Sequence, residues 1–232
     1  MRSVKSEFKL IKRGFTNPLV LIPGWATDYR IFDSLDLNYD YILPVEFSPL
    51  DFEAALSSYL GKNSIHKISL FGWSLGAFLA AEFASKNSEK IEDLFLVGIR
   101  RRYNLKSLQE IETKLEKNRK AYLYSFYRDC FSRADKEGWR WFKERLLKDY
   151  LENMPLERLL TGLDYLSCVY LKPQALLKVK KIKIFQGTED KIAPIKYAEV
   201  IKSNLPQAEF ICVEDSGHAL FLNPDFKIIF NE

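Results

Sequence analysis

The chain is poor in the residues that form disulfides and bind metals. Its 232 residues include only three cysteines and two histidines. Cys130, Cys168 and Cys212 lie far apart, so they provide neither a disulfide framework nor the paired spacing of a zinc site. We therefore expect reduced thiols, which are usual in the cytoplasm, and neither a metal nor an organic cofactor.

Long apolar runs are also missing. The longest mostly apolar stretch, residues 70–84, is interrupted by Ser74 and Glu82 and is too short to span a bilayer. The first fourteen residues alternate basic and apolar side chains without a continuous apolar segment, so we expect no signal peptide. These absences favour a cytoplasmic protein, which we expect to be a monomer that does not bind membranes.

The net charge of +4 is small, but it is unevenly distributed. Residues 100–172 carry 17 Lys and Arg against 11 Asp and Glu, whereas the rest of the chain carries 18 against 20. The aromatic residues of the basic part are spaced like a helix-packing face and are not interleaved with the basic ones as on a stacking surface. We therefore expect no nucleic-acid partner.

Alternating strand and helix patterns dominate the chain outside this basic part. Strands are predicted at residues 8–12, 19–22, 41–45, 67–71, 94–97, 182–185 and 209–213. Helices are predicted at residues 28–35, 52–60 (with Asp51 as N-cap), 75–85, 194–203 and 224–230. This alternation predicts an α/β fold with a mostly parallel, doubly wound sheet.

The strand pattern stops between residues 100 and 171. Residues 103–131 and 136–151 have helical apolar spacing, and Pro155 and Gly162 interrupt the remainder of this region. We predict a core made of residues 1–99 and 179–232. A helical cap, residues 100–178, is predicted to be inserted over the carboxyl edge of the sheet.

A Gly-x-Ser-x-Gly motif, residues 72–76, joins the fourth predicted strand to the next helix. A serine on so sharp a turn occupies rarely allowed backbone angles, and Gly72 and Gly76 leave room for the turn to close. The motif predicts Ser74 as a nucleophile and the Leu75 amide, at the positive end of the helix, as an oxyanion donor. The alternative is a glycine-rich turn with an incidental serine.

A serine nucleophile needs a general base and a third group that orients the base. His218 follows the last strand, at the edge expected to hold Ser74, whereas His66 precedes the fourth strand at the opposite end. Asp190 follows the sixth strand and is the predicted orienting acid, with the adjacent Glu189 as its competitor. The alternative for Asp190 is a turn or N-cap residue.

A second oxyanion donor is expected from the loop after strand 19–22. Gly24 and Trp25 lie there, so we predict the Trp25 amide as this donor. Trp25 can also be a core aromatic, and both roles are compatible because the indole can pack on the substrate.

With serine, aspartate and histidine in this order, the sequence resembles the α/β-hydrolase superfamily from about residue 19 to residue 224. Within it, the sequence is similar to the pimeloyl-acyl-carrier-protein methyl ester esterases of biotin synthesis. The motifs that carry the resemblance are Pro23-Gly24-Trp25, Gly72-Trp73-Ser74-Leu75-Gly76, Gly187 to Pro194, and Gly217-His218-Ala219-Leu220-Phe221 with Asn223-Pro224. Pro23 stands where that family usually has histidine.

The resemblance implies a cap whose basic residues contact an acidic acyl-carrier protein and whose aromatic residue lines the acyl channel. Phe126 is the candidate liner, although it can equally be cap core. Arg101, Arg140 and Lys143 are the candidate carrier contacts, with Arg140 and Lys143 on one helix face. The alternative for these basic residues is a solvated helical surface.

The expected function is a serine carboxylesterase that acts through an acyl-enzyme on the methyl ester of pimeloyl-acyl-carrier protein. The alternatives are a general short-chain esterase or thioesterase, a quinone-pathway lyase on the same scaffold, and a catalytically silent binding protein.

Overall fold

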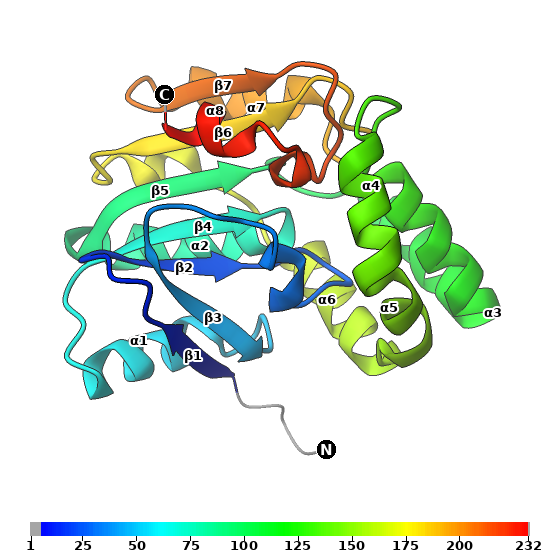
Figure 1. Ribbon diagram of the computed structural model, residues 1–232, viewed down its shortest axis with the longest axis horizontal. Coiled ribbons are helices and arrows are strands. Elements are labelled where there is room, and N and C mark those ends of the chain that lie inside the picture. Colours follow the sequence, from blue (N-terminus) through cyan, green and yellow to red (C-terminus); the bar gives the residue numbers. More distant parts are fainter. Residues whose placement is uncertain (1–5, 232) are drawn as a thin grey trace.

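A seven-stranded sheet crosses the molecule in the order β1-β3-β2-β4-β5-β6-β7 (Figure 1). The computed structural model describes residues 6–231. The strands are β1 (Glu7–Ile11), β2 (Pro18–Ile22), β3 (Asp40–Glu46), β4 (Ile68–Trp73), β5 (Ile91–Val97), β6 (Ile182–Gly187) and β7 (Glu209–Val213). β1 pairs antiparallel with β3, and the other pairings are parallel. The predicted mostly parallel sheet is confirmed.

Burial explains which strands lie in the middle of the sheet. β4 is buried along its whole length, and β2 is buried from Leu19 onward. Such continuous apolar runs need cover on both faces. In Figure 1, α8 (Phe226–Asn231) lies in front of the sheet and α2 (Leu75–Lys86) lies behind it. α1 (Phe52–Lys62) and α7 (Ile195–Ser203) complete the helices outside the cap.

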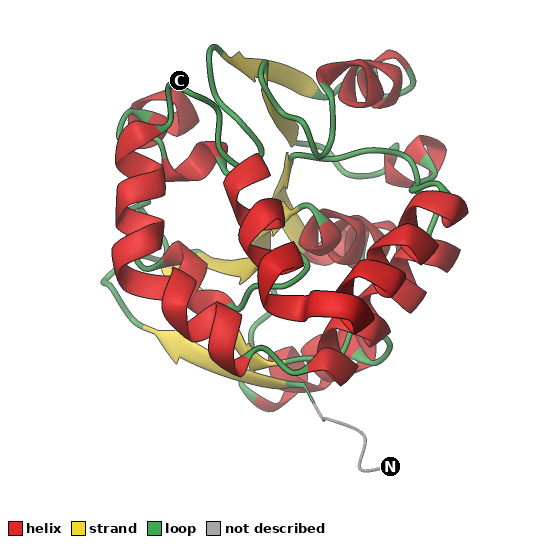
Figure 2. Cartoon of the chain, turned by 90° about the vertical axis from the view of Figure 1, so that its right-hand side faces the viewer, coloured by secondary structure: helices red, strands yellow, loops and turns green. Residues whose placement is uncertain are grey.

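Residues 98–181 contain helices and turns but no strand. The elements are α3 (Leu105–Asp129), α4 (Lys136–Phe142), a π-helical turn η3 (Lys143–Leu147), α5 (Lys148–Asn153), α6 (Leu156–Cys168) and a 3-10 turn η4 (Pro173–Leu176). The helices α3 to α6 gather beyond the carboxyl ends of the strands, and Figure 2 shows them facing the viewer in front of the sheet. None of the helices within residues 6–231 is both long and apolar enough to cross a bilayer.

Two local predictions hold only in part. The helix expected at residues 28–35 is only a 3-10 turn, η1 (Tyr29–Phe32), because the chain turns away after Asp33. Asp51 is the N-cap residue of α1, as predicted, but its side chain makes no capping hydrogen bond. Its carboxylate instead accepts hydrogen bonds from the hydroxyl and amide of Ser6, at 2.6 and 3.4 Å, and so ties α1 to the segment before β1.

Candidate catalytic site

Ser74 lies on the sharp turn between β4 and α2. Its backbone angles, φ 56° and ψ −114°, combine a positive φ with a ψ that non-glycine residues rarely adopt. The turn closes because its glycines have no side chain. A Cβ on Gly72 would lie 2.4 Å from the carbonyl oxygen of Gly76, and a Cβ on Gly76 would lie 2.2 Å from that of Ile22. The sequence therefore places the serine at the carboxyl edge of the sheet.

His218 and Asp190 meet at the same edge, on the loops that come after β7 and β6. The distance from His218 Nδ1 to Asp190 Oδ2 is 2.7 Å, and both side chains are almost fully buried. Glu189, the competing acid, is exposed. His66 is also exposed, in the loop before β4. Of the two histidines and the two adjacent acids, the structure thus brings together the pair expected from the sequence.

The Asp190 carboxylate accepts hydrogen bonds from four groups. Oδ2 accepts hydrogen bonds from His218 Nδ1 and from Gln186 Nε2 (2.8 Å), and Oδ1 accepts the amides of Ile192 (2.8 Å) and Ala193 (2.7 Å). An ionised carboxylate only accepts, so it satisfies all of these donors. Gln186 was missed in the sequence analysis because a glutamine within a buried strand carries no catalytic signature.

The other imidazole nitrogen is available for proton transfer. His218 Nε2 is buried and has no hydrogen-bond partner within the described residues. Tyr103, in the segment after β5, lies near Ser74, and burial raises the pKa of its phenol. Its sequence position alone did not reveal this neighbour of the serine.

Gly98 and Trp73 shape the space around His218. Gly98 has φ 59°, and a Cβ built there would lie 2.8 Å from both His218 Nδ1 and His218 Cε1. Trp73 donates from its indole nitrogen to the carbonyl of His218 at 2.9 Å. Gly98 directly follows β5, at the sheet edge that also holds Ser74. This position is the sequence signal that could have indicated its role.

The expected oxyanion donors lie on two different elements. Leu75 is the first residue of α2, whose N-terminal amides point toward the edge that holds Ser74. Trp25 is buried, and its indole donates to the carbonyl of Leu159 in α6 at 2.9 Å. A narrow hollow of about 20 Å³ touches both residues, with Phe47 and Arg158 in its lining.

The cap holds the loop that carries Trp25. The Tyr127 hydroxyl donates to the Ala26 carbonyl at 2.6 Å, and the Tyr150 hydroxyl donates to Asp28 Oδ1 at 3.0 Å. Further contacts join Arg158 Nη2 to the Thr27 carbonyl (2.9 Å) and Arg30 to Asp149 (2.7 Å). The inserted helices therefore form part of the wall of this site.

The remaining predicted residues lie beside Trp25 or toward the surface. The centroid of the Phe126 ring lies 4.9 Å from that of Trp25, edge to face, so Phe126 forms part of the same wall. Arg140 and Lys143 are exposed. Arg101 is half-buried, and its guanidinium is hydrogen-bonded to the hydroxyl of Tyr170 and packs on that ring.

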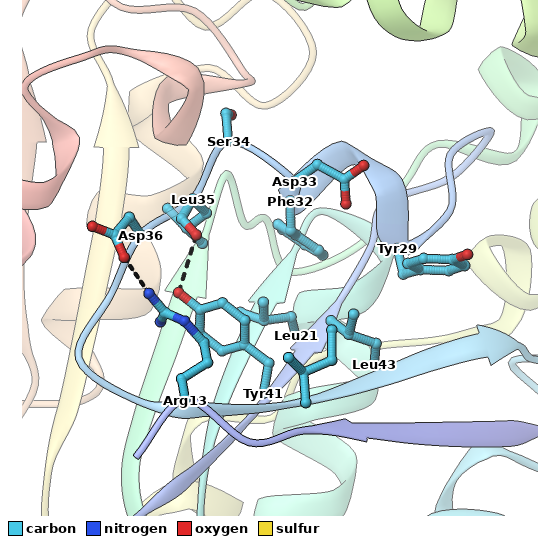
Figure 3. A pocket seen from close by; sticks show the side chains of 11 residues that line it. Arg13, Leu21, Tyr29, Phe32, Asp33, Ser34, Leu35, Asp36, Tyr41 and Leu43 are labelled. Atoms are coloured by element: carbon cyan, nitrogen blue, oxygen red, sulfur yellow. Dashed lines mark hydrogen bonds and ion pairs between the residues drawn. The ribbon is translucent and has the colours of Figure 1, made fainter. Parts of the chain in front are cut away.

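A larger hollow, of about 340 Å³, lies away from these residues, beside β1, β3 and η1 (Figure 3). Its apolar lining includes Leu21 and Leu43, and its rim includes Arg13 and Tyr41. The Arg13 guanidinium is paired with Asp36 and packs over the Tyr41 ring. None of the residues predicted from the motifs lines this hollow, so volume alone does not identify the site.

The sequence matches the model of the Alpha/beta hydrolase family over residues 19–226. No curated protein matches it. Among solved structures, it is similar to an esterase from Exiguobacterium antarcticum, with a TM-score of 0.82 and 18% identity over 98% of this chain and 94% of that one. It is also similar to a thermophilic esterase from Thermogutta terrifontis, with a TM-score of 0.82 and 16% identity over 98% and 91%.

An enol-lactonase from Burkholderia xenovorans is similar as well, with a TM-score of 0.81 and 13% identity over 99% of this chain and 95% of that one. At these identities the likeness shows a shared fold. The activity must be argued from the residues themselves.

Proposed function

Because the chain belongs to the alpha/beta hydrolase family and has its fold, we propose that it hydrolyses carboxylic esters through Ser74, His218 and Asp190. The observation that carries the proposal is the buried 2.7 Å contact between His218 and Asp190, at the sheet edge where Ser74 stands on its strained turn. A nucleophile, a base and an orienting acid from three separate loops are what acyl transfer requires.

In this proposal, Ser74 Oγ attacks the ester carbonyl while His218 Nε2 takes its proton. Asp190 fixes the imidazole tautomer and stabilises the imidazolium that forms. The amides of Leu75 and Trp25 stabilise the negative oxygen of the tetrahedral intermediate. The imidazolium then protonates the departing alcohol, and a water deprotonated by His218 hydrolyses the acyl-enzyme.

For the substrate, we propose the methyl ester of pimeloyl-acyl-carrier protein. Three features support it: the similarity of the motifs, the position of Phe126 against Trp25, and the exposed basic side chains of Arg140 and Lys143. The Arg101 guanidinium already packs on Tyr170, so we expect it to contribute less to carrier binding than Arg140 and Lys143.

A general short-chain esterase is the second candidate, and the burial of the proposed nucleophile favours it. Ser74 is only 6% exposed. A small ester reaches so buried a serine more readily than an acyl chain tethered to a carrier does.

A substrate panel tests both candidates. Wild type and Ser74→Ala would be offered p-nitrophenyl acetate, pimeloyl-carrier methyl ester and an acyl-CoA at low and physiological ionic strength. Carrier binding predicts that kcat/KM for the carrier ester falls steeply between about 0.01 and 0.15 M salt, as the Debye length shrinks from about 30 to 8 Å. Activity confined to the neutral short ester would support the general esterase, and hydrolysis that survives in Ser74→Ala would refute both.

A further inference from the structure

One short segment of the cap holds the backbone on both sides of His218. This segment, residues 130–135, connects α3 to α4, and we call it the clasp. The amide of Ala219 donates to the carbonyl of Cys130 at 3.0 Å, and the amide of Gly217 donates to Asp135 Oδ2 at 2.8 Å. The backbone amides of the two residues that flank the histidine are therefore anchored to the same piece of the cap.

Asp135 is the centre of the clasp. Its side chain is buried, and the oxygen that receives the Gly217 amide also receives the Ser132 amide at 2.7 Å. A single carboxylate oxygen thus fixes the clasp and the histidine loop together. A buried carboxylate is costly unless charge-assisted hydrogen bonds of this kind satisfy it.

Ser132 extends the contact along the loop. Its hydroxyl donates to the carbonyl of Asp215 and accepts the amides of Ala134 (3.0 Å) and Asp135 (3.1 Å). Asp215 has φ 56°, a left-handed conformation that costs free energy at a non-glycine residue. The clasp therefore stabilises the turn from which His218 projects.

The clasp and the histidine loop touch backbone to backbone. A Cβ on Gly217 would lie 2.7 Å from both the Cys130 carbonyl oxygen and the Ser132 nitrogen. From the other side, the Trp73 indole holds the carbonyl of His218. Neither the loop nor the clasp can shift alone without breaking buried hydrogen bonds.

We propose that Asp135 is a positioning residue for His218, an inference that rests on the proposed function. Through the amide of Gly217, it holds the imidazole in line between Asp190 and Ser74. Misplacing a catalytic group by about 1 Å can cost on the order of 10²-fold in rate. The cap thereby determines the efficiency of the base as well as covering the site.

The test uses three variants of the full chain. Asp135→Ala removes the acceptor. Asp135→Asn keeps a carbonyl oxygen that can receive both amides but has no charge. Glu137→Gln, two residues further along the chain and exposed, removes one cap charge without touching the hydrogen bonds of the clasp and is the matched control.

For a p-nitrophenyl ester, we expect Asp135→Ala to lower kcat about 10- to 100-fold with KM changed less than about twofold. Asp135→Asn should recover kcat to within about threefold of wild type, and Glu137→Gln should match wild type. A folded Asp135→Ala with wild-type kcat would overturn the proposal, as would a loss confined to KM. Equal losses in the alanine and asparagine variants would also overturn it.

A second measurement needs no substrate. We expect the proton in the hydrogen bond between His218 and Asp190 to give a low-field NMR resonance. This resonance should be absent in Asp190→Asn. It should broaden in Asp135→Ala and persist in Asp135→Asn. If wild type hydrolyses no ester but this pattern holds, the proposed function fails and the positioning role stands; an unchanged resonance in Asp135→Ala refutes the role.

If Asp135→Ala does not fold, Ser132→Ala decides. It removes the hydroxyl contact to Asp215 and leaves Asp135 in place, so we expect a smaller loss of kcat, of about fivefold. Wild-type kcat in a folded Ser132→Ala would overturn the proposal.

Discussion

Gly98 and His218 are so close that the imidazole occupies the space a side chain on residue 98 would need. A Cβ there would stand 2.8 Å from the His218 ring and 3.6 Å from Asp190 Oδ2. We therefore expect Gly98→Ala to displace the imidazole and lower kcat by about 10- to 100-fold. Steady-state kinetics on a short ester, with circular dichroism to check the fold, measures this effect.

Two glycines provide controls for this substitution. Gly14 also has a positive φ, 92°, but no atom within 4 Å of the added Cβ, so Gly14→Ala tests backbone strain without the clash. Gly61 lies in α1 with open space, so Gly61→Ala should be neutral or stabilising by up to about 1 kcal/mol. A kcat loss in Gly14→Ala as large as in Gly98→Ala would remove the contact with His218 as the cause.

The neighbouring acids Asp190 and Glu189 should respond very differently to substitution by the corresponding amide residues. In Asp190→Asn, an amino group can take the place of the oxygen that accepts from His218 Nδ1. This favours the wrong imidazole tautomer. We expect kcat to fall by about 10³- to 10⁴-fold, whereas Glu189→Gln, with its exposed side chain, should retain wild-type kcat. Similar kcat values for the two variants would show that Asp190 is not the orienting acid.

Tyr127 should stabilise the loop that carries Trp25. Its buried hydroxyl donates to the carbonyl of Ala26, which has a positive φ of 60°. Tyr127→Phe leaves that carbonyl without this donor, so the free energy of unfolding should fall by about 1–3 kcal/mol. Tyr124 lies in the same helix and is 49% exposed, so Tyr124→Phe is the control and should unfold like wild type in urea. Equal stability of the two variants would contradict an anchoring role.

Several buried tyrosines should make the free energy of unfolding depend on pH in the alkaline range. Burial raises the pKa of Tyr127, Tyr150 and Tyr165, and it raises the pKa of Tyr39 to about 12. Phenols in the unfolded chain lose their protons near pH 10, so above this pH the unfolded state binds fewer protons than the native state.

The free energy of unfolding should consequently fall as pH rises from about 9 to 11. Each such tyrosine contributes a slope of up to about 1.4 kcal/mol per pH unit. Urea titrations at pH 7.5, 9 and 10.5 measure this. Equal stability at all three values would mean that the phenols titrate normally in the native state.

Local pattern was enough to predict the sheet and the residues at its carboxyl edge. The strand-turn-helix context of Ser74 and the late position of His218 depend on spacing that can be read directly along the chain. Because parallel strands end at one edge, residues after β4, β6 and β7 had to lie near one another. The same order of strands and helices along the chain predicts the α/β-hydrolase fold.

Contacts between segments that are far apart in the sequence could not be predicted from local patterns. Nothing in the sequence near Asp135 indicates that its carboxylate receives the amide of Gly217, 82 residues away. Asp51 is the N-cap residue of α1, but its carboxylate bonds Ser6 instead of a helix amide, since a long-range partner competed with the local one. Gln186 and Tyr103 likewise owe their places beside Asp190 and Ser74 to packing that no short motif encodes.

Covalent labelling tests most directly whether Ser74 is a nucleophile activated by His218. Wild type would be treated with a fluorophosphonate and examined by intact mass and peptide mapping. We predict one adduct per chain, located on Ser74, no adduct in Ser74→Ala, and strongly slowed labelling in His218→Ala. An adduct on another residue, or unchanged labelling of Ser74→Ala, would contradict the catalytic role of this serine.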